Sequence, residues 1–254
     1  MTPPRVSSLD DGRIARVELA DPPRNVLDGA TLDALTAALR GLGQHGPARA
    51  LLLTAEGPNF SFGASVPEHA PEQAPLMLTR FHEAIRAALD VSLPTVAVLR
   101  GQCLGGGLEL ALTATRLVAA PSARLGQPEI RLAALAPVAS LLLPHRLGQA
   151  RAEALLLSGR VITAAEALTL GLVDEVADDP EAAALAWLRE HILGHSAAAL
   201  RLATRAARWA LRRELDLLLP ELELLYRDQL LATRDAAEGV RAFVERRTPT
   251  WSDR

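Results

Sequence analysis

The stretch from residue 93 to residue 112 constrains the fold most, because a buried strand passes through a cluster of glycines into a helix. Residues 93–99 are apolar and rich in β-branched side chains, which predicts a buried strand that ends at Gly101. Residues 108–112 are good helix formers, so a helix is expected to begin at Gly105–Gly107. A strand that leads directly into a helix is typical of an α/β fold.

The glycines at the start of this predicted helix indicate a site for negative charge. Backbone N–H groups in a first helical turn lack intrahelical acceptors, and the helix dipole adds about half a positive charge there. Glycine also lets a ligand approach the backbone, because no Cβ is in the way. Glu109 stands three residues after Gly106, so its carboxylate is expected on the same helix face as the Gly106 N–H. The alternative is that the glycines only allow close packing of the helix on the strand.

Strand and helix patterns alternate along the first half of the chain. Residues 14–19 alternate apolar and polar side chains as a half-buried strand does, and residues 27–42 repeat leucines at helical spacing. Further buried strands are expected at residues 48–54 and 116–120. This order predicts an α/β fold with a parallel sheet and crossover helices.

The rest of the chain, from residue 133 almost to its end, has helical patterns broken by glycine, proline and polar turns. We therefore expect an α/β core over residues 1–195 and a C-terminal helical subdomain over residues 196–254. In the last predicted helices, leucines occupy more of the helix circumference than a single amphipathic stripe does. One apolar face is therefore expected to remain uncovered by the chain's own core and to pack on a partner subunit.

Three loops are candidates for the functional site. Residues 56–65 form a glycine-punctuated loop that leaves the carboxyl end of a predicted strand, where α/β sheets place ligands. Residues 67–75 contain three prolines and are expected to form a surface loop that could cover a pocket. Residues 121–130 are rich in turn formers and include Glu129, for which a solvated side chain is the default expectation.

The composition argues against several classes of protein. The net charge is −3, no lysine occurs, and no basic run indicates a nucleic-acid partner. The single cysteine, Cys103, excludes an internal disulfide and a multi-cysteine metal site, and it is expected to pack in the core of a protein from a reducing compartment. No apolar stretch reaches the roughly 20 residues of a membrane-spanning helix, and the N-terminus lacks an apolar signal core. We expect a cytoplasmic protein without a metal, a membrane contact or a nucleic-acid partner.

Four motifs, in this order along the chain, resemble those of the crotonase, or enoyl-CoA hydratase/isomerase, family. They are the loop of residues 60–64, the Gly105–Gly107 turn followed by Glu109, the Gly-Gln-Pro-Glu segment that ends at Glu129, and the tail of residues 238–251. The resemblance covers nearly the whole chain. It implies a crotonase-like core of ββα spiral units with a C-terminal α-helical subdomain.

The resemblance also implies roles for particular residues. The backbone N–H groups of Ala64 and Gly106 would form an oxyanion hole for an acyl-CoA thioester. Glu109 and Glu129 would hold one water, so that one carboxylate takes its proton and the other delivers a proton to the α-carbon. Residues expected to contact the CoA part of the substrate are Arg24, Asn25, Phe62, Gly105, Phe243 and Arg246. CoA is then part of the substrate, no cofactor is expected, and the family assembles as a homotrimer or a dimer of trimers.

Departures from the common hydratase pattern concern the substrate. Ser65 stands where the family usually has aspartate, Phe62 fills a usually small position, and residues 136–140 replace a glycine-rich turn. These features resemble most the branch that hydrates cyclohexa-1,5-diene-1-carbonyl-CoA in anaerobic benzoyl-CoA degradation. An apolar wall against an alicyclic ring is consistent with that substrate.

The sequence is also compatible with other functions. A general enoyl-CoA hydratase or an enoyl-CoA isomerase would share most of these motifs, although an isomerase needs only one carboxylate. Some family members bind RNA, and a stripe of arginines on one predicted helix could serve that purpose: Arg205, Arg208, Arg212 and Arg213. A serine hydrolase is disfavoured because no Gly-x-Ser-x-Gly turn occurs. Structural or surface roles are expected for His69, His82 and His145.

Overall fold

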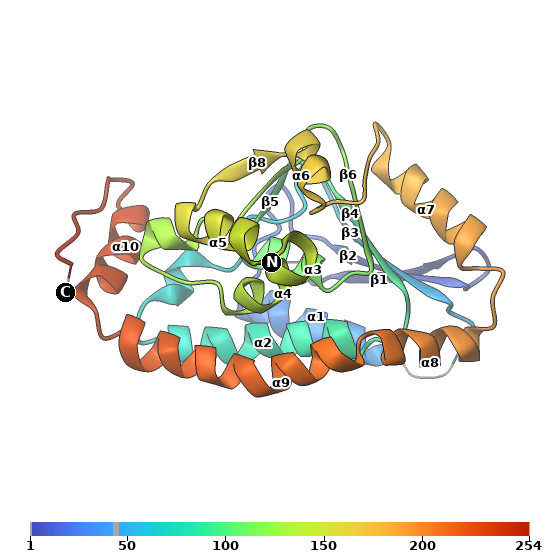
Figure 1. Ribbon diagram of the computed structural model, residues 1–254, viewed down its shortest axis with the longest axis horizontal. Helices are drawn as coiled ribbons and strands as arrows, with labels where there is room; N and C mark the ends of the chain where they lie inside the picture. The colour runs from blue at the N-terminus through green and yellow to red at the C-terminus, as the bar shows by residue number, and fades with distance from the viewer. Residues whose placement is uncertain (1, 43–45, 254) are drawn as a thin grey trace.

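The computed structural model describes residues 2–42 and 46–253 and contains two sheets (Figure 1). The larger sheet has six strands, in this order across it: β1 (Arg5–Leu9), β2 (Ile14–Leu19), β3 (Ala50–Ala55), β4 (Thr95–Leu99), β6 (Arg116–Ala119) and β9 (Glu175–Val176). All neighbours are parallel except β1 and β2. The predicted parallel sheet is confirmed, and the four strands expected from the sequence begin and end within two residues of the observed ones.

The central strands are buried on both faces, as their continuous apolar runs predict. On one face, Val17, Leu51 and Ala97 belong to a core that also includes residues of helices α1 (Gly29–Gly41) and α2 (Ala74–Asp90). On the other face, Val96 and Val98 pack with residues of helix α7 (Pro180–His191), which lies across the sheet in Figure 1. The sheet is therefore covered by helices on both faces.

A second, smaller sheet contains β5 (Gln102–Leu104), β7 (Arg124–Gly126) and β8 (Val161–Thr163). The chain leaves β4, turns at Gly101, forms β5 and enters helix α3 (Gly106–Leu112) within a few residues. This β4–β5–α3 unit is the ββα arrangement that the family resemblance implies. Strand β5 is too short for the sequence pattern to predict, because its three residues depend on pairing with β7.

Helices dominate the second half of the chain, as predicted. They are α4 (Pro137–Leu147), α5 (Gln149–Ser158), α6 (Ala164–Leu170), α8 (Ala197–Ala207), α9 (Trp209–Leu224), the π-helical segment η3 (Leu225–Leu230) and α10 (Arg234–Val244). Two 3₁₀ turns, η1 (Val66–His69) and η2 (Glu129–Leu132), lie near the predicted loops. The expectation of helix throughout is wrong at β8 and β9, where two short segments gain hydrogen-bond partners from distant strands.

The last helices form a long arm along the underside of the core (Figure 1). Helix α9 packs on α4, and His82 on α2 bonds through Nδ1 to Glu223 Oε1 at 2.5 Å. Leu215 and Leu219 are fully buried against the core. Ser196 caps α8 by accepting a hydrogen bond from Ala199 N. That this arm is a separate subdomain stays a prediction.

Candidate active site

The site begins where β5 ends and α3 starts. Gly105 has φ of +51°, and a Cβ there would lie 2.6 Å from Oε1 of Glu129. Only glycine adopts this conformation without strain and also leaves room for the carboxylate. The Gly105 N–H donates to Gly126 O at 2.9 Å, so the start of α3 is tied to the segment that holds Glu129.

Two backbone amides lie close together at this junction. The loop of residues 60–65 pairs with β5 through Ser61 N to Gln102 O at 2.9 Å and Leu104 N to Ser61 O at 3.0 Å. A Cβ on Gly106 would lie 3.2 Å from Ala64 N, which shows that the two amides are neighbours. Within the described ranges, neither the Ala64 N–H nor the Gly106 N–H donates to a protein acceptor. The predicted pair is therefore brought together with both donors available.

Gly63 allows this close approach. Its φ is +90°, and a Cβ there would lie 2.7 Å from Leu104 O and 3.1 Å from Gly106 N. Any side chain would therefore intrude between the two amides. The Ser61 hydroxyl is buried under the same loop, where it donates to Asn25 O at 2.7 Å and accepts from Gly63 N at 3.0 Å. These bonds shape the loop and hold it against the turn at Asn25.

Glu109 lies in the first turn of α3 with its side chain buried (4% of the residue exposed). Its Oε1 accepts a hydrogen bond of 2.7 Å from Ala139 N, in the first turn of α4. Burial raises the pKa of Glu109 to about 7, although the backbone amides of Ala139 and Val138 favour the ionised form. The first turn of α4 therefore holds a carboxyl group whose proton is exchangeable near neutral pH.

Glu129 is the first residue of η2 and is half-buried. Its carboxylate lies next to the Gly105 backbone. Burial, together with the negative charge of Glu109, raises its pKa to about 8. In the amide orientation that satisfies both groups, the Gln127 nitrogen donates to both Glu129 oxygens at 3.0 Å. The default expectation of a solvated glutamate is therefore wrong, since Glu129 shares a site with Glu109. Two carboxyl groups with raised pKa values can hold one proton between them near neutral pH.

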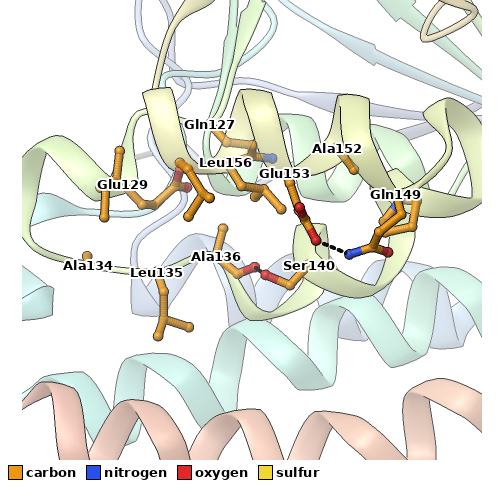
Figure 2. A pocket seen from close by; sticks show the side chains of 13 residues that line it. Gln127, Glu129, Ala134, Leu135, Ala136, Ser140, Gln149, Ala152, Glu153 and Leu156 are labelled. Carbon is orange, nitrogen blue, oxygen red and sulfur yellow. Dashed lines mark hydrogen bonds between the residues drawn. The ribbon is translucent and has the colours of Figure 1, made fainter.

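A cavity of about 270 Å³ adjoins Glu129 (Figure 2). Glu129 and Gln127 lie on one side of it, and Gln149 donates to Glu153 at 2.8 Å on another. Most of the remaining wall is aliphatic: Ile130, Ala134, Leu135, Ala136, Pro144, Ala152, Leu156 and Leu157. The cavity can hold an apolar group directly beside Glu129.

The residues predicted to contact CoA are spread over two surfaces. Arg24 and Phe62 are exposed on adjacent loops, which are joined by a hydrogen bond from Phe62 N to Arg24 O at 3.0 Å. Asn25 is buried, and its side-chain amide donates to Glu56 O and Asn59 O at 2.9 Å. Its side chain therefore shapes the loop.

Phe243 and Arg246 lie at the end of α10, which packs on η1 and η2. Both residues are exposed. The structure thus brings α10 next to the element that begins at Glu129. CoA contacts of all six residues stay a prediction.

Several residues at the site had no individual prediction from the sequence. The Phe81 ring on α2 packs against the start of α3, since a Cβ on Gly106 would lie 2.9 Å from its Cε2. The amides of Ala139 and Gln127 hold the two carboxyl groups. Tyr226, the one tyrosine in the sequence, is buried in η3 within the electrostatic reach of both glutamates. The only feature of the sequence that set this residue apart is that no other tyrosine occurs.

Among the described residues, no three side chains of the His, Cys, Asp and Glu types gather as metal ligands would. None of the helices over residues 2–42 and 46–253 combines the length and apolar character that crossing a bilayer requires.

Comparisons with known proteins agree with this geometry. The family described as enoyl-CoA hydratase/isomerase matches residues 10–254. The chain is 51% identical over 247 residues to a cyclohexa-1,5-dienecarbonyl-CoA hydratase of Thauera aromatica, covering 96% of this chain and 95% of that protein. It is 35% identical to a probable enoyl-CoA hydratase of Mycobacterium bovis, covering 96% of each. A crystal structure of an enoyl-CoA hydratase from Mycobacterium avium subsp. paratuberculosis matches with a TM-score of 0.85, 26% identity and 98% coverage of both chains.

Proposed function

The chain belongs to the enoyl-CoA hydratase/isomerase family, and from that premise we propose that it hydrates cyclohexa-1,5-diene-1-carbonyl-CoA. One observation supports this above the others: two carboxyl groups with raised pKa values lie beside two free backbone amides at the start of α3. The relative from Thauera aromatica, 51% identical, supports the choice of substrate. The reaction is the addition of water to a double bond of an unsaturated thioester.

The amide pair would stabilise the charge that develops during addition. As water attacks the conjugated system, negative charge moves onto the thioester oxygen. The Ala64 and Gly106 amides are neighbours and donate to no protein acceptor within the described residues, so they are available for that oxygen. The positive end of the α3 dipole adds to the effect at Gly106.

The carboxyl pair would supply the proton transfers. Raised pKa values of about 7 for Glu109 and about 8 for Glu129 mean that one group can be ionised while the other keeps its proton. The ionised carboxylate takes a proton from water as the C–O bond forms, and the protonated carboxyl gives its proton to carbon. The pair holds the same number of protons before and after, so the cycle needs no other acid or base.

The cavity beside Glu129 would hold the alicyclic ring. Its walls are mainly aliphatic, and Ala136 and Leu156 face the space in which Glu129 lies (Figure 2). A volume of about 270 Å³ is ample for a six-membered carbon ring. The ring would then lie within reach of both carboxyl groups, with its thioester at the amide pair.

CoA is part of the substrate in this proposal, and water addition changes no net oxidation state, so no further cofactor is required. We assign CoA contacts to Arg24, Asn25, Phe62 and Gly105 on one side, and to Phe243 and Arg246 on the other. We also propose a cytoplasmic location and a role in anaerobic benzoyl-CoA degradation.

A trimer, or a pair of trimers, is the proposed assembly. The helical arm leaves large apolar side chains exposed: Leu202 (64%), Trp209 (62%), Leu217 (66%) and Leu224 (53%). Exposed apolar surface of this extent favours a protein partner. Sedimentation analysis is expected to give three or six copies, and a fully active monomer would contradict the proposal.

An RNA-binding role is less well supported. Arg208 donates to Val91 O at 2.9 Å and Leu89 O at 3.3 Å, and Arg212 is paired with Asp90 and Asp216. Two of the four arginines in the predicted stripe are therefore used within the chain. An isomerase needs only one of the two carboxyl groups, so the paired arrangement favours hydration.

The test is a parallel assay of the purified protein with cyclohexa-1,5-diene-1-carbonyl-CoA and crotonyl-CoA. Loss of conjugation is followed by ultraviolet absorbance, and products are identified by mass spectrometry. We expect addition of one water and a kcat/KM for the cyclic diene at least tenfold above that for crotonyl-CoA. Preference for crotonyl-CoA would indicate a general enoyl-CoA hydratase, and a product of unchanged mass would indicate an isomerase.

A further inference from the structure

The cavity beside Glu129 has a second polar end, which the proposed hydration does not use. Helix α5 contributes Gln149 and Glu153 to its lining, and Figure 2 shows both on the side of the cavity away from Glu129. The Gln149 side-chain amide donates to Glu153 Oε1 at 2.8 Å. A hydrocarbon ring forms no hydrogen bonds, so these two side chains exceed what an unsubstituted ring requires.

The two polar ends are connected by an aliphatic middle section. Ala136 and Leu156 line the cavity there, and Figure 2 shows them between Glu129 and the pair on α5. Along α5, Ala152 is fully buried and Leu156 is half-buried, whereas Gln149 and Glu153 are exposed. The cavity therefore extends from Glu129 to a mouth that is open to solvent at the polar pair.

The side chains at this mouth have hydrogen-bonding capacity left over. Within residues 2–42 and 46–253, Gln149 is the one group that donates to Glu153, and no arginine or histidine pairs with this carboxylate. A carboxylate offers about four acceptor sites. The Ser140 hydroxyl, which also lines the cavity, donates to Ala136 O at 2.9 Å, and its oxygen can still accept. Acceptors are in excess, so the mouth suits a ligand group that donates a hydrogen bond.

The ring orientation in the proposed reaction directs one ring carbon to this mouth. The thioester lies at the amide pair, and Glu129 lies next to Gly105 at that same end. Carbon C4 is opposite the carbon that carries the thioester, so it lies furthest from this end. C4 is saturated in a cyclohexa-1,5-diene and takes no part in the conjugated system. A hydroxyl on C4 needs about the space of one water, ~30 Å³, in a cavity of about 270 Å³.

We propose that Glu153 and Gln149 bind a hydroxyl group on the far side of the ring, so that the substrate class includes ring-hydroxylated alicyclic thioesters. The inference rests on the proposed function, because the same cavity holds the ring. The hydroxyl donates to Glu153 and accepts from the second amide hydrogen of Gln149. A carboxylate at the same ring position is rejected, because it has no proton to donate and meets the negative charge of Glu153. The pair determines specificity and transfers no proton.

The test uses ring-saturated analogues, which bind without being hydrated. Calorimetry measures the Kd of cyclohexane-1-carbonyl-CoA, of its cis- and trans-4-hydroxy derivatives, and of its 4-carboxy derivative. One hydroxy isomer is expected to bind about 3- to 10-fold more tightly than the unsubstituted thioester, as for one added hydrogen bond. The 4-carboxy derivative is expected to bind about tenfold more weakly, because like charges meet. If neither hydroxy isomer gains affinity, or if the 4-carboxy derivative loses none, the proposal is overturned.

Two variants at one position separate recognition from packing. Glu153→Gln keeps an acceptor oxygen but removes the charge, so the preference for the hydroxyl should persist while the rejection of the 4-carboxy derivative is lost. Glu153→Ala should abolish both. Glu166→Ala is the matched control, since it changes another helical glutamate, which is paired with Arg160 outside the cavity lining. It should leave the order of affinities unchanged. If Glu153→Ala keeps that order, the pair only stabilises α5 and the proposal is wrong.

Failure of the proposed function would be distinguishable from failure of this inference. The affinities of the saturated analogues are measured without any hydration. If the unmodified protein hydrates neither the cyclic diene nor crotonyl-CoA, the proposed function fails, while the order of the four affinities still decides whether the mouth of the cavity recognises a hydroxyl. If the protein hydrates the cyclic diene but binds all four analogues equally, the function stands and the inference is overturned.

Discussion

The two sides of the active site are built in different ways. On one side, the amide wall consists of the backbone N–H groups of Ala64 and Gly106, which do not ionise in the physiological pH range. On the other, the carboxylate wall consists of Glu109 and Glu129, whose protons are exchangeable near pH 7 and 8. One wall acts through fixed dipoles and the other through proton transfer.

The walls also differ in how much of the fold they require. The amide wall needs one loop paired with β5 and the first turn of α3. The carboxylate wall needs α3, η2, the first turn of α4 and the packing of α10 on η2. Damage to the amide wall should therefore lower the rate without moving the pH optimum, whereas damage to the carboxylate wall should change both.

The largest effect is expected when the carboxylate wall is neutralised. Glu109→Gln and Glu129→Gln should each lower kcat by about 10²–10⁴-fold, because each removes a positioned acid or base. Binding of the substrate, measured by calorimetry with the double variant, should be nearly retained because the amide wall is intact. Glu166→Gln, a change at an exposed glutamate paired with Arg160, is the control. A double variant with normal turnover would rule out the two-carboxylate mechanism.

The next effect is expected from the amide wall. Gly106→Pro removes one oxyanion donor and should lower kcat by about 10²–10³-fold with an unchanged pH optimum. Proline is compatible with the first position of a helix, but its ring would approach Phe81, which lies 2.9 Å from the Cβ position. Phe81→Leu in the same chain provides the space. If activity returns in that background, the loss was steric and the Gly106 N–H is not the donor.

A smaller effect is expected where the two walls meet. Gly105→Ala places a methyl group 2.6 Å from Glu129 Oε1 and forces a residue with φ of +51° to carry a side chain. Displacement of the carboxylate should lower kcat by about tenfold and shift the pH optimum. Gly41→Ala, where nothing lies within 4 Å of the new Cβ, is the control for a glycine replacement. An unshifted optimum would show that Glu129 does not depend on this contact.

The smallest effect concerns stability. Because folding raises the pKa of Glu129 to about 8 from its ordinary value of 4.5, the unfolded chain binds fewer protons between these values. The free energy of unfolding should then fall as pH rises through that interval. Glu129→Gln removes this cost and should stabilise the protein by about 2 kcal/mol at pH 9, with almost no difference at pH 4. Urea unfolding at the two pH values measures it, and a destabilised variant at pH 9 would contradict the raised pKa.

The amide wall was the more predictable of the two from sequence. Its residues lie in local patterns: a strand, glycines and a helix start, with the partner loop at the end of the preceding strand. The strands of the parallel sheet were predictable for the same reason. Strands β5, β8 and β9 were not, because segments of two or three residues are defined by distant partners.

The chemical character of the carboxylate wall could not be read from local patterns. The motif positions identified Glu109 and Glu129, but their raised pKa values depend on burial by α4 and η2. The hydrogen bond from Ala139 N joins segments 30 residues apart. Such long-range contacts depend on tertiary packing, which the periodicity of a segment does not encode.

The most direct test of this account is the pH dependence of kcat/KM for cyclohexa-1,5-diene-1-carbonyl-CoA. This profile reports the ionisations of the free enzyme. Carboxyl groups with pKa values of about 7 and about 8 predict a bell with its maximum between them, whose limbs belong to the coupled pair. Glu109→Gln or Glu129→Gln should each abolish the bell. A profile that is flat from pH 6 to pH 9, with full activity at both ends, would contradict the division of one proton between these two carboxyl groups.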